Sequence, residues 1–112
     1  KEQVIIQDKS TRNSIVIDSV KNAMTIKAQG DLSIEAGGRV TINGMAMTLT
    51  GKQSAKLEAG QSSVDLQAAA ATIKSVNIDV QANAQASLKA NAQVSIQGSA
   101  MVQVQGGIVK IN

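Results

Sequence analysis

The chain of 112 residues contains no proline, cysteine, histidine, phenylalanine, tyrosine or tryptophan. Without His or Cys the usual zinc, iron and thiol sites cannot form, and Ser-His-Asp or Cys-His catalysis is excluded. Aromatic rings normally supply much of the core of a compact globular domain, so their absence argues against such a domain. The absence of proline leaves every backbone N–H free to donate to a β-ladder. These absences favour a thin β-structure.

The acidic side chains do not form a recognisable site. No neighbouring group is placed to drive the pKa values of two carboxylates apart, as acid–base catalysis requires. The calcium-binding nonapeptide of parallel β-rolls needs Gly-Gly-x-Gly-x-Asp, and Gly37-Gly38 and Gly106-Gly107 lack the following Gly and Asp. We therefore predict no enzyme activity, no cofactor and no metal site. The carboxylates are Glu2, Asp8, Asp18, Asp31, Glu35, Glu58, Asp65 and Asp79.

The net charge is +3, but the basic residues are spread along the chain and no aromatic residue lies between them. Nucleic-acid binders usually cluster Lys and Arg and add aromatic rings for base stacking. We therefore predict a solvated surface and no nucleic-acid partner. Asp79 is the last acidic residue, and from Gln81 onward the polar positions are mainly amides. Such a stretch suits either contact with a membrane or a cap, or amide side chains that satisfy one another across strands.

An alternating pair of aliphatic residues recurs about every eight residues, and a small residue follows two places after each pair except the last. Alternation places both members of a pair on one face of a β-strand. Between Leu66 and Val80 two registers fit, because Val76 competes with the assigned pair. The pairs are Ile15/Ile17, Met24/Ile26, Leu32/Ile34, Val40/Ile42, Met47/Leu49, Ala55/Leu57, Val64/Leu66, Ala71/Ile73, Ile78/Val80, Ala86/Leu88, Val94/Ile96, Val102/Val104 and Val109/Ile111.

Each unit is a short strand with one apolar face, which a single chain cannot cover with eight residues per turn. Three copies wound around one axis solve this problem, because their apolar pairs fill a narrow prism and their strand edges meet strands of neighbouring copies. Small residues keep Cβ atoms out of the tight corners, and Gly44, Gly51, Gly98 and Gly106 can also supply positive φ there. The predicted fold is all-β, an intertwined homotrimeric triple-stranded β-helix. Its predicted core contains Ile26, Ile34, Ile42, Leu49, Leu57, Leu66, Ile73, Val80, Leu88, Ile96, Val104 and Ile111.

The uniform repeat indicates one shaft with a less regular beginning. We predict an irregular lead-in over residues 1–23, with a first strand at Val4–Ile6 and a loop over Asp8–Asn13, and a shaft over residues 24–112. No signal peptide or transmembrane stretch is visible. Because the chain begins at Lys1, it is expected to be a fragment of a longer polypeptide. At a rise of about 5 Å per octad, the thirteen units predict a rod of about 65 Å.

The repeat resembles the carboxy-terminal β-helix of the valine-glycine-repeat (VgrG) spike proteins of bacterial type VI secretion, and of the central spikes of contractile phage tails. The tandem octads carry this resemblance over nearly the whole chain. The stretches that show it are Asn13–Asp18, Thr25–Ala28, Leu32–Ala36, Val40–Gly44 and the ending Gly106–Asn112. The resemblance does not extend to a hub, an oligosaccharide-binding fold or an effector domain.

The resemblance implies a rigid, membrane-piercing spike shaft at the tip of a contractile injection apparatus. It is expected to be a homotrimer, to join a hub, baseplate or tail tube through a region before Lys1, and to meet the target membrane transiently. It also implies that a PAAR-repeat tip protein docks on the terminal layer. The docking residues carried over are Gly107, Ile108, Val109, Lys110, Ile111 and Asn112. The apparatus is assembled in the cytoplasm or virion and is delivered into the target envelope.

Two other classes of protein fit parts of the pattern. The first is the shaft of a tail fibre or trimeric adhesin, which acts as a spacer for a receptor-binding head. An ending at Gly106–Asn112 that closes the last layer argues against a head there. The second is a functional amyloid, because proline-free alternating strands suit cross-β stacking. A particle of discrete size distinguishes both shafts from the amyloid.

Overall fold

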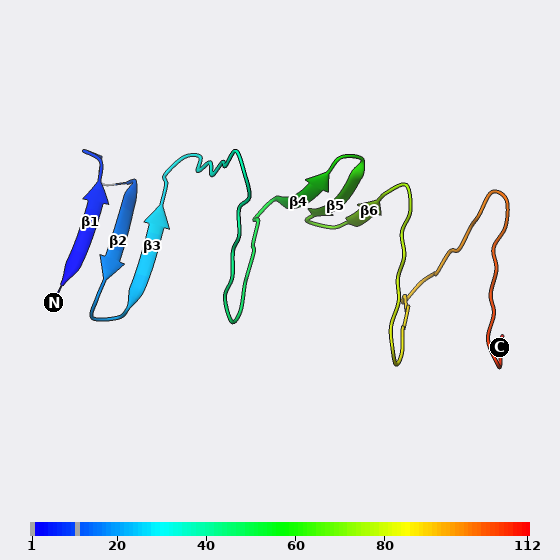
Figure 1. Cartoon of the computed structure of the whole chain (residues 1–112). Helices are drawn as coiled ribbons and strands as arrows, with labels where there is room; N and C mark the ends of the chain where they lie inside the picture. Colours follow the sequence, from blue (N-terminus) through cyan, green and yellow to red (C-terminus); the bar gives the residue numbers. More distant parts are fainter. Residues whose placement is uncertain (1, 11) are drawn as a thin grey trace. The chain divides into compact units, whose positions relative to one another are not determined.

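The computed structural model describes residues 2–10 and 12–112, and it confirms the all-β class. Within these residues there are six strands and no helix, so no helix is long and apolar enough to cross a bilayer. The strands form two antiparallel sheets of three strands each (Figure 1). The chain divides into two units, Lys1–Thr48 and Leu49–Asn112, and each unit holds one sheet.

The first sheet consists of β1 (Gln3–Gln7), β2 (Ser14–Asp18) and β3 (Ala23–Lys27), in that order. The predicted lead-in strand therefore lies within β1. Residues directly opposite in an antiparallel pair share a face of the sheet. The register aligns two apolar rows on one face, since Val4 and Met24 flank Ile17 while Ile6 and Ile26 flank Ile15. The opposite face carries the row Ile5, Val16 and Thr25.

The connection between β2 and β3 is held by Asp18. Its Oδ1 accepts hydrogen bonds from the backbone N–H groups of Val20 (3.0 Å) and Lys21 (3.2 Å), which is the arrangement of an Asx turn. Asn22 closes the turn with φ of 53°, a conformation that Asn tolerates better than most residues do. The side chain of Asp18, the last residue of β2, thereby stabilises the turn that leads into β3.

The loop between β1 and β2 is organised around Asp8. Ser10 Oγ donates to Asp8 Oδ1 (2.7 Å), and Asn13 Nδ2 donates to Asp8 Oδ2 (2.6 Å). These two hydrogen bonds favour the ionised carboxylate, so they hold the pKa of Asp8 below its ordinary value of 3.8. Asn13 Oδ1 in turn accepts the backbone N–H of Gln29 at 2.8 Å. The predicted loop thus joins the start of the chain to the residues after β3.

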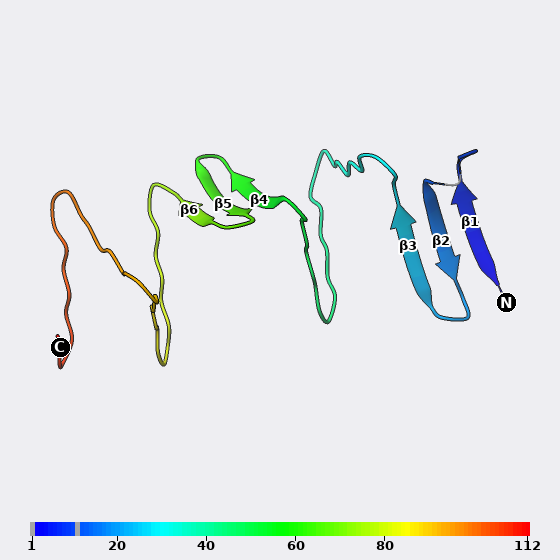
Figure 2. The same ribbon diagram turned by 180° about the vertical axis from the view of Figure 1, so that it is seen from behind.

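The second sheet consists of β4 (Ser54–Ala59), β5 (Ser62–Gln67) and β6 (Ala71–Lys74), with β5 in the centre (Figure 2). Ala55 and Ala71 flank Leu66, and Leu57 and Ile73 flank Val64. The three aliphatic pairs of this region therefore share one face. Antiparallel pairing sets the first member of one pair opposite the second member of the next.

The β4–β5 connection is a two-residue hairpin loop in which Gly60 has φ of 57°. A positive φ at the first central residue is what a type II′ turn requires, and glycine supplies it without a steric penalty. Among the described residues only Asn22 and Gly60 have positive φ. The expectation of positive φ at Gly44, Gly51, Gly98 and Gly106 is therefore wrong.

Those four corner glycines instead fit the other expectation, that small residues keep the corners open. A Cβ built on Gly51 would overlap the carbonyl oxygen of Ser54, and one built on Gly98 would overlap that of Met101. At Gly44 and Gly106 the Cβ would lie 3.2 Å from a backbone carbonyl oxygen. The chain bends so tightly that the next segment occupies the space of a side chain, so these positions need a small residue for room and not for φ.

From residue 29 on, the backbone changes direction at intervals of seven or eight residues. The small residue of each octad lies directly before or within one of these positions, as predicted for corners. Figure 1 shows the chain turning back at bends in both units. The described bends and turns fall at residues 29–30, 37–38, 45–46, 52–53, 60–61, 68–69, 76, 83–84, 91–92, 99–100 and 107–108.

The structure also resolves the register between Leu66 and Val80. Val76 occupies a bend, whereas Ala71 and Ile73 lie in β6 on the apolar face. The assigned pair Ala71/Ile73 is therefore supported, and Val76 is a corner residue. The turns and bends that precede β5, separate it from β6 and follow β6 begin eight residues apart, at residues 60, 68 and 76. The aliphatic pairs themselves are spaced less regularly.

The octads outside the two sheets make no strand pairing within the part of the chain that the structure describes. Residues 30–53 and 75–112 contain bends but no backbone-to-backbone hydrogen bond of their own outside the sheets. The sheets, by contrast, pair neighbouring octads of one chain. The expectation that every octad strand pairs with neighbouring copies thus does not describe β1–β3 and β4–β6, where short loops let consecutive strands pair locally.

Candidate functional surface

The candidate functional surface is the uncovered apolar face of each sheet. Among residues 2–10 and 12–112 no side chain, apolar or polar, is buried. The chain exposes 11651 Å², about twice the area that a compact chain of this length exposes. An antiparallel sheet normally packs at least one face against a core. Neither sheet has such a cover within the described residues.

The first sheet gathers six aliphatic side chains on this face. Ile15 and Ile17 on the central strand are 37% and 39% exposed, and Met24 at the edge is 65% exposed. A shallow hollow runs along the face between Ile6, Ile15 and Ile26 and extends to Leu32, the first member of the next pair. The apolar surface therefore continues past β3 into the following octad.

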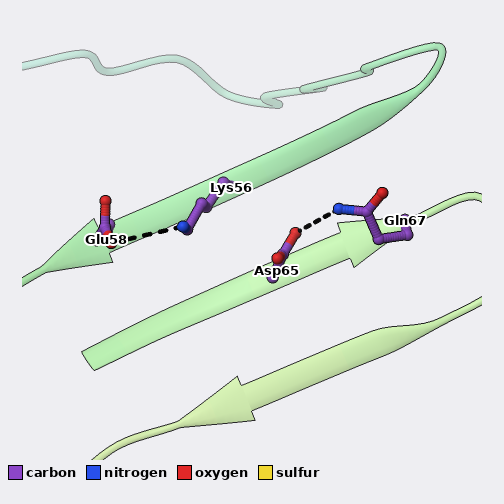
Figure 3. A network of polar contacts seen from close by, with 4 residues as sticks. All are labelled: Lys56, Glu58, Asp65 and Gln67. Atoms are coloured by element: carbon purple, nitrogen blue, oxygen red, sulfur yellow. Dashed lines mark hydrogen bonds and ion pairs between the residues drawn. The ribbon is translucent and has the colours of Figure 1, made fainter. Parts of the chain in front are cut away.

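The second sheet has a strictly divided surface. Its apolar face carries the rows around Val64 and Leu66, and a hollow against Leu57 and Val64 is lined almost entirely by apolar atoms. The other face is polar. Lys56 Nζ lies 3.5 Å from Glu58 Oε2 along β4, and Gln67 Nε2 donates to Asp65 Oδ1 (3.0 Å) along β5 (Figure 3).

This polar face behaves as a solvated surface. The Lys56 and Glu58 side chains are 52% and 60% exposed, and exposed ion pairs of this kind contribute at most about 1 kcal/mol. Lys56 lies directly opposite Asp65 in the register, yet its ion pair runs along its own strand. The charges therefore make this face polar and do not hold the strands together.

The predicted trimer-core residues all lie at exposed positions in the single chain. The structure brings Leu57 and Ile73 to either side of Val64, with Leu66 on the same face. Ile26 lies beside Ile15 in the first sheet. The remaining members lie in octads without strands, namely Ile34, Ile42, Leu49, Val80, Leu88, Ile96, Val104 and Ile111.

Val4 and Ile6 share the apolar face of the first sheet but were not among the predicted core residues. The run Val4-Ile5-Ile6 is apolar at three successive positions, so alternation alone does not show which of these residues share a face with Ile15 and Ile17. The register with β2 supplies that information by placing Val4 and Ile6 beside Ile17 and Ile15. The signal in the sequence that could have indicated these two core residues is an apolar run shortly before the first clear octad.

The predicted docking residues begin at a bend. Gly107 and Ile108 form this bend, and a Cβ at Gly107 would meet no atom within 4 Å. Ile108 is 90% exposed and Ile111 is 89% exposed, whereas Val109 is half exposed. Ile108 differs from the equivalent second bend positions of the three preceding octads, which are Ala84, Ala92 and Ala100. A large aliphatic side chain thus occupies a corner position that holds alanine in the three preceding octads.

Ionisable side chains offer little sign of chemistry. Asp8 has a lowered pKa because Ser10 and Asn13 donate to its carboxylate, and both oxygens are engaged in the loop. Across the described residues no three acidic side chains come together in a group that could hold a metal ion. No buried side-chain polar atom there lacks a partner. The arrangement is suited to association through apolar surface.

Comparisons of the chain with protein-family models, with curated proteins and with solved structures found no match.

Proposed function

We propose that three copies of this chain assemble through their apolar faces into an intertwined triple-stranded β-helix. One observation carries the proposal: each sheet gathers aliphatic side chains on one face, and that face has no cover within the described chain. Burying a Val, Leu or Ile side chain contributes about 1.5–3 kcal/mol. Because none of the described side chains is fully buried, much of this energy is gained only when the chain meets other chains.

The octads without strands support association of the same kind. Their backbone N–H and C=O groups have no backbone partner across residues 30–53 and 75–112, although their aliphatic residues keep the alternation of a strand. Buried backbone groups are almost always hydrogen-bonded in folded proteins. Strands supplied by two further copies would satisfy these groups and cover the aliphatic pairs together, and the tight bends at Gly51 and Gly98 suit a narrow prism.

We propose that the assembled rod is the shaft of a contractile injection spike. The support is the tandem octad pattern that resembles valine-glycine-repeat and phage-tail spikes, together with regular bends in the backbone. Intertwined chains cannot slide apart without breaking many hydrogen bonds and exposing apolar surface at the same time, so axial load is shared. A rod of about 65 Å, at about one strand spacing per octad, exceeds a bilayer of about 40–45 Å.

The terminal octad is the proposed platform for a PAAR-repeat tip. Ile108 exposes an apolar side chain at a corner. It is not a member of the pair Val109/Ile111, so a partner can bind it without displacing that pair. The test is capture of a purified PAAR-repeat protein by the assembled chain, measured by surface plasmon resonance. Ile108→Asp is expected to weaken capture by about tenfold or more, as loss of an apolar anchor does.

Ala100→Asp is the matched control, because residue 100 holds the same bend position one octad earlier. It is expected to leave capture unchanged. Assembly without any capture would contradict the spike function and favour a fibre or adhesin shaft. Equal loss from both variants would contradict docking at the terminal octad.

A further inference from the structure

We propose that Asn43 is a site of spontaneous deamidation that is open in the single chain and closed by assembly. It is the one Asn in the sequence that precedes a glycine. In the described structure the Asn43 side chain is exposed and forms no hydrogen bond, and Gly44 belongs to no strand. Deamidation begins when the backbone nitrogen of the next residue attacks the Asn side-chain carbonyl carbon. Both groups are therefore free to react.

The step is balanced by water alone. The Gly44 nitrogen forms a bond to Cγ of Asn43 and gives up its proton, the Cγ–Nδ2 bond breaks, and ammonia leaves with that proton. The resulting five-membered succinimide then adds water at one of its two carbonyls, which yields aspartate or isoaspartate. Glycine favours the attack, because it has no Cβ to crowd the nitrogen and its backbone is the least restricted.

Asn13 supplies an internal comparison. Its side chain is fixed at both ends, since Nδ2 donates to Asp8 (2.6 Å) and Oδ1 accepts from the Gln29 N–H (2.8 Å). The following residue, Ser14, begins β2 and is paired with both Gln7 and Lys27. The Asn13 carbonyl carbon cannot swing toward the Ser14 nitrogen without breaking these contacts. One asparagine is therefore held and the other is not.

Closure by assembly rests on the proposed function. Asn43 follows Ile42, so alternation turns it away from the apolar face, but its backbone would become part of a strand shared with other copies. A strand fixes the backbone, and the attack needs it to move. Isoaspartate also adds a carbon to the main chain, which would shift the alternation between Ile42 and the pair Met47/Leu49. Unassembled copies that carry isoaspartate would thus be excluded from later assembly.

The experiment follows the two sites by peptide mapping after incubation at pH 8 and 37 °C, with the number of chains per particle measured on the same sample. In a single-chain fraction Asn43 is expected to react at least about tenfold faster than Asn13, since Gly44 favours the attack at Asn43 while hydrogen bonds hold Asn13. Urea should accelerate Asn13 and leave Asn43 nearly unchanged. Equal rates at the two sites without urea, or equal acceleration by urea, would overturn the open site.

Where the sample is an assembled particle, Asn43 is expected to react slowly and to accelerate when urea dissociates the chains. An assembled particle in which Asn43 reacts as fast as in urea would overturn closure. A sample that never assembles would contradict the proposed function and leave the single-chain comparison to decide the site. Asn43→Gln is the control for assignment of the signal, because cyclisation of glutamine needs a larger ring and the product at position 43 should disappear.

Discussion

Ile15 of β2 lies directly opposite Ile26 of β3, and both side chains are exposed to solvent in the single chain, by 37% and 53%. Two isoleucines side by side on an uncovered sheet face are unfavourable in water. The same relationship is repeated by Leu57 and Val64 in the second sheet. Within the two sheets the local pairing of strands is therefore complete, while the burial that stabilises a folded protein is not. The predictions below separate these two levels.

Ile34→Asp is expected to prevent assembly. Ile34 is 72% exposed in the single chain, so the substitution disturbs little there, but three carboxylates in one layer of a prism would face severe desolvation. Sedimentation velocity should show only single chains. Lys27→Asp is the control, because Lys27 lies on the opposite face of β3 from Ile26. A normal assembly formed by Ile34→Asp would contradict the inward position of Ile34.

Gly60→Ala is expected to lower the stability of the second sheet by about 1 kcal/mol, because alanine is strained at positive φ. The β4–β5 turn has φ of 57° at this residue. Gly37→Ala provides a matched comparison, since its Cβ would meet nothing within 4 Å and its φ is not positive. Thermal unfolding followed by circular dichroism should show a lower midpoint for Gly60→Ala alone. Equal midpoints for the two variants would contradict the turn geometry.

Gly98→Ala tests the tight bends. The added Cβ would overlap the Met101 carbonyl oxygen, which belongs to the backbone and cannot rotate away. We expect a loss of about 1–3 kcal/mol, as for an overpacked site. At Gly107 the space is open, so Gly107→Ala should be tolerated. Urea unfolding of the two variants gives the comparison, and a Gly107→Ala variant as unstable as Gly98→Ala would count against the bend geometry.

Asp8 predicts a dependence of stability on pH in the acid range. Its folded-state pKa is lowered by hydrogen bonds from Ser10 and Asn13. The contribution of ionised Asp8 to stability is therefore fully present above its ordinary pKa of 3.8, and it is lost as the pH falls through the lower pKa of the folded state. Asp8→Asn should flatten the acid limb of the unfolding midpoint plotted against pH.

Asp31→Asn serves as the charge control for that experiment, because Asp31 forms no side-chain hydrogen bond in the part of the chain that the structure describes. The control should retain the acid limb of the unmodified protein. An identical acid limb for the protein and Asp8→Asn would show that the loop does not depend on the ionised carboxylate.

Sequence pattern was sufficient to predict which aliphatic residues share a face. Ala55, Leu57, Val64 and Leu66 were assigned by alternation, and the register places them together. Alternation has this power because successive strand residues point to opposite faces whatever the partner is. The small residues before each bend were likewise recognisable, since a tight corner excludes bulky side chains.

Partner choice and turn geometry were not predictable in the same way. A strand edge can pair with its own chain or another, and the decision at β4–β5 depends on Gly60 adopting positive φ. A small residue alone does not reveal the sign of φ, so the need for room at glycines 44, 51, 98 and 106 was predictable, whereas the positive φ was not and belongs to Gly60. Val76 was ambiguous because its aliphatic side chain fits the pattern although it lies at a bend.

The most direct test of the account is the absolute mass of the protein in dilute solution, measured by light scattering together with sedimentation equilibrium. The account predicts a discrete particle of three chains that persists on dilution and resists heating. A stable single chain would contradict the triple-stranded β-helix and with it the spike shaft, and open-ended polymers would contradict it in favour of cross-β stacking.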